Sequence, residues 1–127
     1  MYDAFLSVLE ATAREALDAQ RPAQLGVFVD RAFDPTDALS RDRRSENDEL
    51  MGGPRKDDTL VMIRVDGADG NPIAVLPIYG VHGTLNDSDN HLASTDVTGG
   101  LERVLQEQFD DPVVVMHLQG AAGDVSP

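Results

Sequence analysis

The sequence contains no cysteine and no tryptophan, and only 5% of its residues are aromatic. Without cysteine, these 127 residues cannot form disulfides, thiolate nucleophiles or cysteine-ligated zinc and iron–sulfur sites. The few aromatic side chains argue against a stacking surface for single-stranded nucleic acid. No apolar run reaches the length of about 18 residues that a membrane span requires. The first five residues lack the basic and apolar regions that are typical of a signal peptide.

Basic residues are also scarce, since 10 Lys and Arg stand against 23 Asp and Glu, for a formal net charge of −13. Lys56 is the only lysine. Nucleic-acid phosphates and anionic lipid headgroups both attract clustered cations, so this balance argues against either as an electrostatic partner. The length gives room for one domain rather than two, and a hydrophobic content of 41% allows it to bury a core.

Apolar side chains at three- and four-residue spacings predict two helices. The first covers residues 3–20 and ends before Pro22, whose ring disfavours helix in the preceding residue. The second covers residues 96–109, with Thr95 or Asp96 as its N-cap. Gly99 and Gly100 in its first turn disfavour helix by about 1 kcal/mol each, which suggests that something approaches the backbone closely there.

Apolar runs predict four strands at residues 25–29, 59–65, 73–81 and 113–118, the first of them buried. Turn-forming residues between the second and third runs, from Asp66 to Pro72, predict a hairpin. Pro77 indicates an edge position or a bulge. Residues 30–58 are highly charged with little to bury, and we expect an ordered or partly ordered surface loop. The order of elements predicts an α/β or α+β fold, a mixed sheet with flanking helices.

Two segments carry side chains suited to catalysis. The chain ends on Gly123-Asp124-Val125-Ser126-Pro127, which could present the Ser126 hydroxyl beside glycine N–H groups that approach an oxyanion, or could be an ordinary turn. Arg44, in Arg43-Arg44-Ser45, could hold a carboxylate, a phosphate or an oxyanion, although with nine arginines its position could equally be chance.

The histidines are candidates for metal binding. His82 follows a predicted strand in Gly80-Val81-His82-Gly83-Thr84 and could ligate zinc or simply bond a carbonyl. We expect His91 to be solvated and His117 to be a partnered histidine within a strand. Because no closely spaced pair of histidines occurs, a metal would need ligands from elsewhere.

Several of these motifs occur together in a recognisable order. They are Arg44-Ser45, residues 58–65, residues 70–73, Val81-His82-Gly83-Thr84, Ser94-Thr95-Asp96 with Gly99, and the closing Gly-Asp-Val-Ser-Pro. In order and approximate spacing they resemble the catalytic domain of the neutral (non-lysosomal) ceramidases. The opening helix and the strand at 25–29 are similar to the family's segment just after its first zinc-binding motif. The closing motif is the most specific part of the resemblance.

The resemblance implies a zinc-dependent hydrolase that cleaves the amide bond of ceramide to a fatty acid and sphingosine. Ser126 would match the catalytic serine, Asp124 its neighbour, and His82 one of two zinc histidines. Arg44 would match the arginine of an Asn-Arg-Ser motif in which this sequence has Arg43 for the asparagine. A lipid amide substrate and a secreted or cell-surface location are also implied. Whether the serine or a zinc-bound water attacks stays open.

By the same resemblance, we expect residues 1–127 to be an interior fragment of a single, larger catalytic domain, with the remaining zinc ligands outside it. The isolated chain is then expected to be inactive and to expose apolar sheet surface. Two alternatives stay open, namely a hydrolase of another substrate on the same scaffold and a non-catalytic fragment or interaction module.

Overall fold

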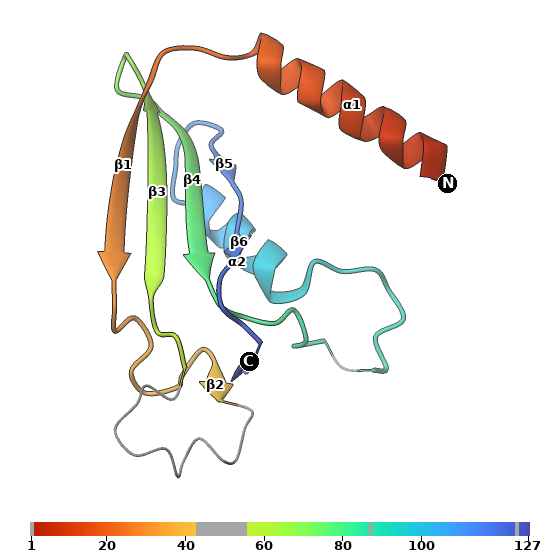
Figure 1. Ribbon diagram of the computed structural model, residues 1–127, viewed down its shortest axis with the longest axis vertical. Helices are drawn as coiled ribbons and strands as arrows, with labels where there is room; N and C mark the ends of the chain where they lie inside the picture. The colour runs from red at the N-terminus through yellow and green to blue at the C-terminus, as the bar shows by residue number, and fades with distance from the viewer. Residues whose placement is uncertain (1, 43–55, 87, 124) are drawn as a thin grey trace.

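The structure is a computed structural model that describes residues 2–42, 56–86, 88–123 and 125–127. It contains a mixed sheet and two helices, as predicted (Figure 1). In chain order the elements are α1 (Tyr2–Asp18), β1 (Ala23–Asp30), β2 (Arg41–Asp42), β3 (Leu60–Gly67), β4 (Pro72–Tyr79), α2 (Asp96–Gln106), β5 (Val114–Val115), β6 (Leu118–Gln119) and β7 (Val125–Ser126). The two predicted helices and the first three predicted strands are therefore confirmed, with small shifts at their ends. The fourth predicted strand, residues 113–118, is instead divided into the two short strands β5 and β6.

The main sheet has the order β1-β3-β4-β5, and β6 also pairs with β4. β1, β3 and β4 are antiparallel, so the predicted hairpin between the second and third apolar runs is confirmed. β5 and β6 both run parallel to β4. α2 provides the long crossover that a parallel connection requires. A second, two-stranded sheet pairs β2 with β7 in antiparallel orientation.

Pro77 lies inside β4, a central strand, so the predicted edge position is wrong. A register shift does occur in the hairpin, but it falls between Val65 and Asp66 rather than at the proline. On its other side, β4 pairs through Ala74 and Val75 with β5 and through Ile78 and Tyr79 with β6. Pro77 lies between these two short ladders, so its missing N–H does not interrupt the pairing of β4 with β5 or with β6.

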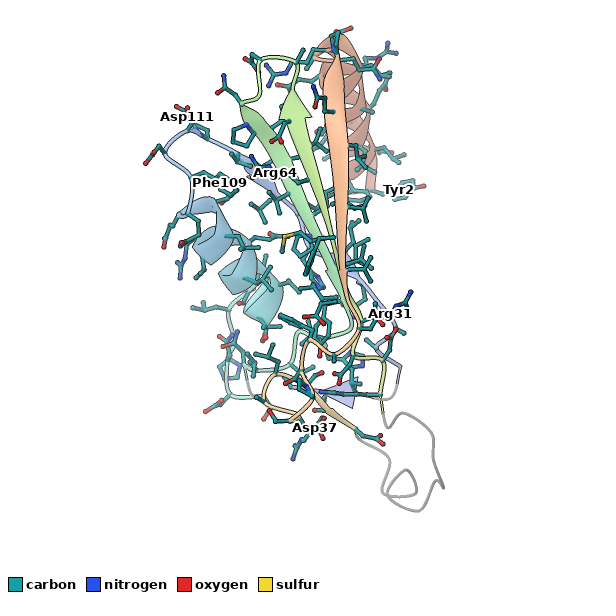
Figure 2. The ribbon with its side chains drawn as sticks, turned by 90° about the vertical axis from the view of Figure 1, so that its left-hand side faces the viewer. Tyr2, Arg31, Asp37, Arg64, Phe109 and Asp111 are labelled. Atoms are coloured by element: carbon teal, nitrogen blue, oxygen red, sulfur yellow. The ribbon has the colours of Figure 1, made fainter. Side chains whose placement is uncertain are left out.

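One face of the sheet packs against α2. Val75, Val113 and Val115 form a buried cluster there, completed by Met62 and by two residues of the α2 region, Leu105 and Phe109. A second cluster joins Leu60, Tyr79 and Val81 to Val97 at the beginning of α2. Figure 2 shows α2 beside this face of the sheet. The core is therefore small, and it lies between α2 and the three strands β3, β4 and β5.

The opposite face of the sheet is apolar and incompletely covered. Strand register places three side chains from each of three strands on it: Leu25, Val27 and Val29, then Val61, Ile63 and Val65, and then Ala74, Leu76 and Ile78. Leu25 is 65% exposed and Val27 is 59% exposed. The predicted burial of residues 25–29 is therefore wrong in this chain. Every residue described in α1 is exposed as well, and the helix projects away from the strands (Figure 1).

The charged segment after β1 is more ordered and more buried than its composition indicates. Asp34, Ser40 and Lys56 are all buried, and Phe33 N donates a hydrogen bond to Asp58 O. The expectation of an ordered surface loop is confirmed for residues 30–42 and 56–58, most of which are exposed, and residues 43–55 lie outside the described part of the chain. The composition did not predict that these three polar side chains are buried. Neither helix in the described part of the chain is long and apolar enough to cross a bilayer.

Candidate functional site

The segments that carry His82 and Ser126 leave the main sheet at the same edge. β4 and β6 are parallel neighbours, so their carboxyl ends lie together, which is where open α/β sheets commonly place binding sites. His82 follows the end of β4 by three residues, and Ser126 follows the end of β6 by seven. Both residues are half-buried. Figure 1 shows the C-terminus near the end of β4 and beside β2.

Two glycines allow the backbones of these segments to touch. A Cβ atom on Gly80 would collide with the carbonyl oxygen of Ala121 and lie 2.9 Å from its carbonyl carbon. A Cβ on Gly120 would lie 2.9 Å from Gly80 N and from the carbonyl carbon of Tyr79. Only glycine fits at such approaches. The motif after β4 and the motif after β6 are therefore held in contact at their starting points.

The carbonyl oxygen of Tyr79 joins the same two segments. It accepts a hydrogen bond from Gly120 N at 3.1 Å and lies 3.0 Å from His117 Nε2. Because a carbonyl oxygen can only accept, Nε2 carries the proton in this contact. The backbone N–H of His117 donates to Glu102 Oε1 at 2.8 Å. The prediction that His117 has a partner is confirmed, but His117 lies between β5 and β6 rather than within a strand. His91 is exposed as expected.

Ser126 belongs to β7, which pairs with β2. Arg41 lies opposite Ser126, and Asp42 lies opposite Val125. Val125 is only 1% exposed, which makes it one of the most deeply buried side chains among the described residues. Asp124 and Arg44 lie outside the described residues, so their assigned roles stay predictions. Along the sequence, Arg44 follows the partner strand of Ser126 by two residues.

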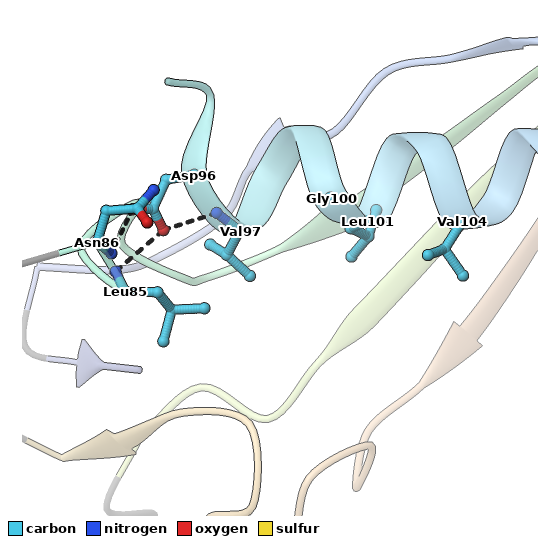
Figure 3. A pocket seen from close by; sticks show the side chains of 7 residues that line it. All are labelled: Leu85, Asn86, Asp96, Val97, Gly100, Leu101 and Val104. Carbon is cyan, nitrogen blue, oxygen red and sulfur yellow. Dashed lines mark hydrogen bonds between the residues drawn. The ribbon is translucent and has the colours of Figure 1, made fainter. Parts of the chain in front are cut away.

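The polar loop after His82 is attached to the start of α2 by Asp96. Its carboxylate accepts hydrogen bonds from Leu85 N at 3.0 Å and from Asn86 N at 2.8 Å (Figure 3). These hydrogen bonds, led by that from Asn86, hold the pKa of Asp96 below its ordinary value. Asp96 has a positive φ of 53°, which is uncommon for a residue other than glycine. Thr95 occupies the N-cap position without a side-chain capping bond.

A shallow groove of about 490 Å³ lies between this loop and α2 (Figure 3). Its lining is mostly aliphatic and comprises Leu85, Asn86, Asp96, Val97, Gly100, Leu101 and Val104. The two predicted glycines of α2 behave differently here. A Cβ on Gly99 would collide with Thr95, whereas a Cβ on Gly100 would meet no atom within 4 Å. The predicted close approach is therefore confirmed at Gly99 and wrong at Gly100.

Sequence reasoning missed a buried ionic cluster below the end of β4. Lys56 Nζ lies 2.6 Å from Asp34 Oδ2, 2.9 Å from Asp37 Oδ1 and 3.3 Å from Asp58 Oδ1, and it also donates to the carbonyl oxygen of Ser40. The side chains of Lys56 and Asp34 are only 3% and 2% exposed. The signal available in the sequence was that the single lysine stands in an otherwise acidic, arginine-containing loop.

The charges in this cluster stabilise one another. Burial by itself raises the pKa of Asp34, but Lys56 and three backbone N–H groups outweigh burial and hold that pKa well below its ordinary value. Burial likewise acts to lower the pKa of Lys56, whereas Asp34 and Asp37 raise it well above its ordinary value. Burial raises the pKa of the Tyr79 hydroxyl. Lys56 is thus a fixed cation, and it is suited to hold structure rather than to exchange protons near neutral pH.

The described residues do not assemble a complete metal site. Within residues 2–42, 56–86, 88–123 and 125–127, no group of three His, Asp or Glu side chains is placed to hold one ion. A catalytic zinc usually takes three protein ligands. The His82 imidazole can supply one ligand, so the described part of the chain does not fit a whole zinc centre.

No family model matches the sequence. Neutral ceramidases B and A of Dictyostelium discoideum are 29% identical to it over alignments of 93 and 94 residues, and each match covers 68% of this chain. The chain spans only 13% of the length of these relatives. The crystal structure of neutral ceramidase from Pseudomonas aeruginosa matches 84% of the chain with a TM-score of 0.69 and 20% identity, and the match covers 18% of that protein.

A structure described as ceramidase complexed with C2 matches 84% of this chain with a TM-score of 0.70 and 20% identity, and the match covers 17% of that protein. At this identity the structural matches establish the shared fold, while the Dictyostelium matches supply the similarity in sequence. Together they agree with the resemblance indicated by the motifs. The chain is similar to the neutral ceramidases in sequence and in fold.

Proposed function

We propose that this chain is part of a hydrolase that cleaves the amide bond of ceramide to release a fatty acid and sphingosine, with Ser126 at the reacting carbonyl. One observation carries the proposal. The parallel pairing of β4 with β6 brings the His82 segment and the Ser126 segment to one edge of the sheet. The similarity to proteins named neutral ceramidases supports ceramide as the substrate.

Each residue has a role that follows from the chemistry of amide cleavage. Hydrolysis adds one water, with the hydroxyl ending on the acyl carbon and a proton on the departing amine nitrogen. A negative charge develops on the carbonyl oxygen, and oriented donors stabilise that charge. We assign to Ser126 either attack on the carbonyl or the orientation of the attacking water. Arg44 would stabilise the oxyanion, and Asp124 would orient its neighbour Ser126.

Zinc dependence belongs to the same proposal. His82 would supply one ligand, and the others would come from residues outside the described ranges. A zinc ion held there supplies Lewis-acid stabilisation of a carbonyl oxygen or a bound water of lowered pKa. A lipid amide substrate is consistent with the aliphatic groove beside the loop that follows His82. A secreted or cell-surface location is the corresponding proposal for where the reaction takes place.

The test uses the protein expressed from its complete reading frame and a fluorescent N-acylsphingosine. We expect Ser126→Ala to lower kcat/KM by at least about a hundredfold, because removing a reacting or orienting group typically costs this much. Ser7→Ala is the matched control, since Ser7 is an exposed serine of α1. Unchanged turnover in Ser126→Ala would contradict the proposal.

Metal dependence and substrate class need separate measurements. His82→Ala should lower the zinc content of the purified protein, measured by mass spectrometry, whereas His91→Ala should leave it unchanged because His91 is exposed in the polar loop. A panel of ceramides and short acyl amides tests the alternative of another hydrolase on the same scaffold. Faster cleavage of the short amides than of every ceramide would favour that alternative.

A further inference from the structure

The ionic cluster around Lys56 organises the backbone that leads into β2. Asp34 accepts hydrogen bonds from the N–H groups of Ala38 at 2.7 Å, Leu39 at 3.1 Å and Ser40 at 3.0 Å. Lys56 binds the same carboxylate and also the carbonyl oxygen of Ser40. Buried polar groups are costly unless they are paired, so these contacts together define one backbone path through residues 38–40.

Ser40 attaches this path to the end of β4. Its side chain is almost wholly buried, and its Oγ lies 2.9 Å from the hydroxyl oxygen of Tyr79. The Tyr79 ring also contacts the ring of Phe33 edge-on, with their centres 5.3 Å apart. Tyr79 is the last residue of β4, and its carbonyl oxygen accepts the hydrogen bond from Gly120. Tyr79 therefore contacts Phe33 and Ser40 through its side chain and the C-terminal segment through its backbone.

Residues 38–40 lead directly into β2, the strand that pairs with the strand of Ser126. Arg41 follows Ser40 in the chain and lies opposite Ser126 in the β2–β7 pair. This pair has only two residues in each strand, which is too short to be stable alone. Its position therefore depends on contacts outside the ladder, which include the burial of the Val125 side chain in β7. On the β2 side, the residue before it is anchored by Lys56, Asp34 and Tyr79.

We propose that Lys56, Ser40 and Tyr79 are positioning residues for Ser126, which act through β2 to hold the serine segment at the edge where His82 leaves the sheet. The proposal rests on the proposed function of Ser126 and adds residues to which the family motifs assign no role. None of the three needs to contact substrate. Their effect is on where the serine backbone lies, and small displacements of a reacting group are costly in rate.

The most informative variants remove one contact and leave the fold intact. Ser40→Ala and Tyr79→Phe each delete one hydroxyl of the pair that joins β2 to β4. The matched controls are Ser7→Ala and Tyr2→Phe, which delete hydroxyls from exposed side chains of α1. Lys56→Met removes the buried cation and leaves three carboxylates without it, so it can fail to fold, whereas Lys56→Arg keeps the charge.

The first measurement is steady-state hydrolysis of the fluorescent N-acylsphingosine by the protein from its complete reading frame. We expect Ser40→Ala and Tyr79→Phe to lower kcat roughly 10- to 100-fold with KM changed less than twofold, since serine placement rather than substrate binding is altered. Lys56→Arg should retain more of the rate than Lys56→Met wherever the latter folds. Wild-type kcat in both hydroxyl variants would overturn the proposal, as would equal losses in the control variants.

The second measurement does not depend on turnover. Amide hydrogen exchange should be at least tenfold faster in β2 and β7 of Ser40→Ala, with exchange in β1 and β3 unchanged. If Ser126→Ala keeps its activity but this pattern appears, the proposed function fails while the structural coupling holds. If exchange in β2 and β7 stays at the wild-type rate, the coupling itself is refuted, whatever the activity of Ser126.

Discussion

The two neighbouring glycines of α2 allow a sharp prediction about stability. Both lie inside the helix Asp96–Gln106, where glycine costs about 1 kcal/mol relative to alanine. A Cβ on Gly100 would meet no atom within 4 Å. Gly100→Ala should therefore gain most of this increment and raise the free energy of unfolding by about 1 kcal/mol. For a chain of this size, that corresponds to a rise of roughly 3–6 °C in Tm.

The same substitution one residue earlier should have the opposite effect. A Cβ on Gly99 would collide with Thr95 Oγ1 and would also lie 2.6 Å from Thr95 Cβ. Rotating the threonine side chain moves the oxygen but leaves its Cβ in place, so the backbone must shift. Such overpacking typically costs about 1–3 kcal/mol, which outweighs the gain in helix propensity. We therefore expect Gly99→Ala to lower the free energy of unfolding.

Urea denaturation followed by circular dichroism measures both variants, and a third variant isolates the cause. In a Thr95→Gly background the colliding Cβ is absent, so Gly99→Ala should become neutral or stabilising. The double-mutant cycle should then give a coupling of about 1 kcal/mol or more between the two positions. Equal stabilisation by Gly99→Ala and Gly100→Ala in the wild-type background would refute this reasoning about the approach of Thr95.

Three further predictions concern the carboxylates of Asp34 and Asp96 and the buried hydroxyl of Tyr79. Because the pKa of Asp34 is depressed in the folded state, the unfolded chain takes up its proton first, and the free energy of unfolding should fall as the pH drops below about 3.8. Because the pKa of Tyr79 is raised in the folded state, the free energy of unfolding should also fall as the pH rises above about 10. This fall should be less steep in Tyr79→Phe, and urea titrations at each pH measure both effects. Asp96→Asn should accelerate amide exchange at Leu85 and Asn86, which donate to this carboxylate, and leave exchange in β3 unchanged. Unaltered exchange at these two amides would contradict the assigned role of Asp96.

The elements of the fold could be predicted because their signals are local. Apolar spacing identified both helices, and alternating turn-formers and apolar runs identified the β3–β4 hairpin. The apolar runs that precede His82 and Ser126 were visible in the sequence, whereas the parallel pairing of β4 with β6 that brings their segments to one edge was not. Glycine beside each motif was visible in the sequence, but the contact between Gly80 and Ala121 was not, because it joins residues about forty positions apart.

Other features could not be predicted because they depend on distant partners. An apolar run such as residues 25–29 has the same sequence whether or not another segment covers it. The segment from Asp30 to Asp58 was interpreted as having little to bury, because charged residues are buried only when they are paired. Lys56 is paired with Asp34, 22 residues earlier, and no spacing rule predicts that contact. Arg44 and Asp124 lie outside the described residues and stay predictions.

The aliphatic sheet surface opposite α2 has a consequence for how solutions of this polypeptide behave. Apolar surface is exposed to water at Leu25, Val27 and Val114, and this exposure favours association between molecules. The net charge of −13 opposes close approach between copies. Added salt screens that repulsion, whose range falls to about 3 Å at 1 M. Sulfate also strengthens the association of apolar surfaces. Purification is therefore expected to succeed in dilute buffer at neutral pH and to give turbid samples in ammonium sulfate or near pH 4.3.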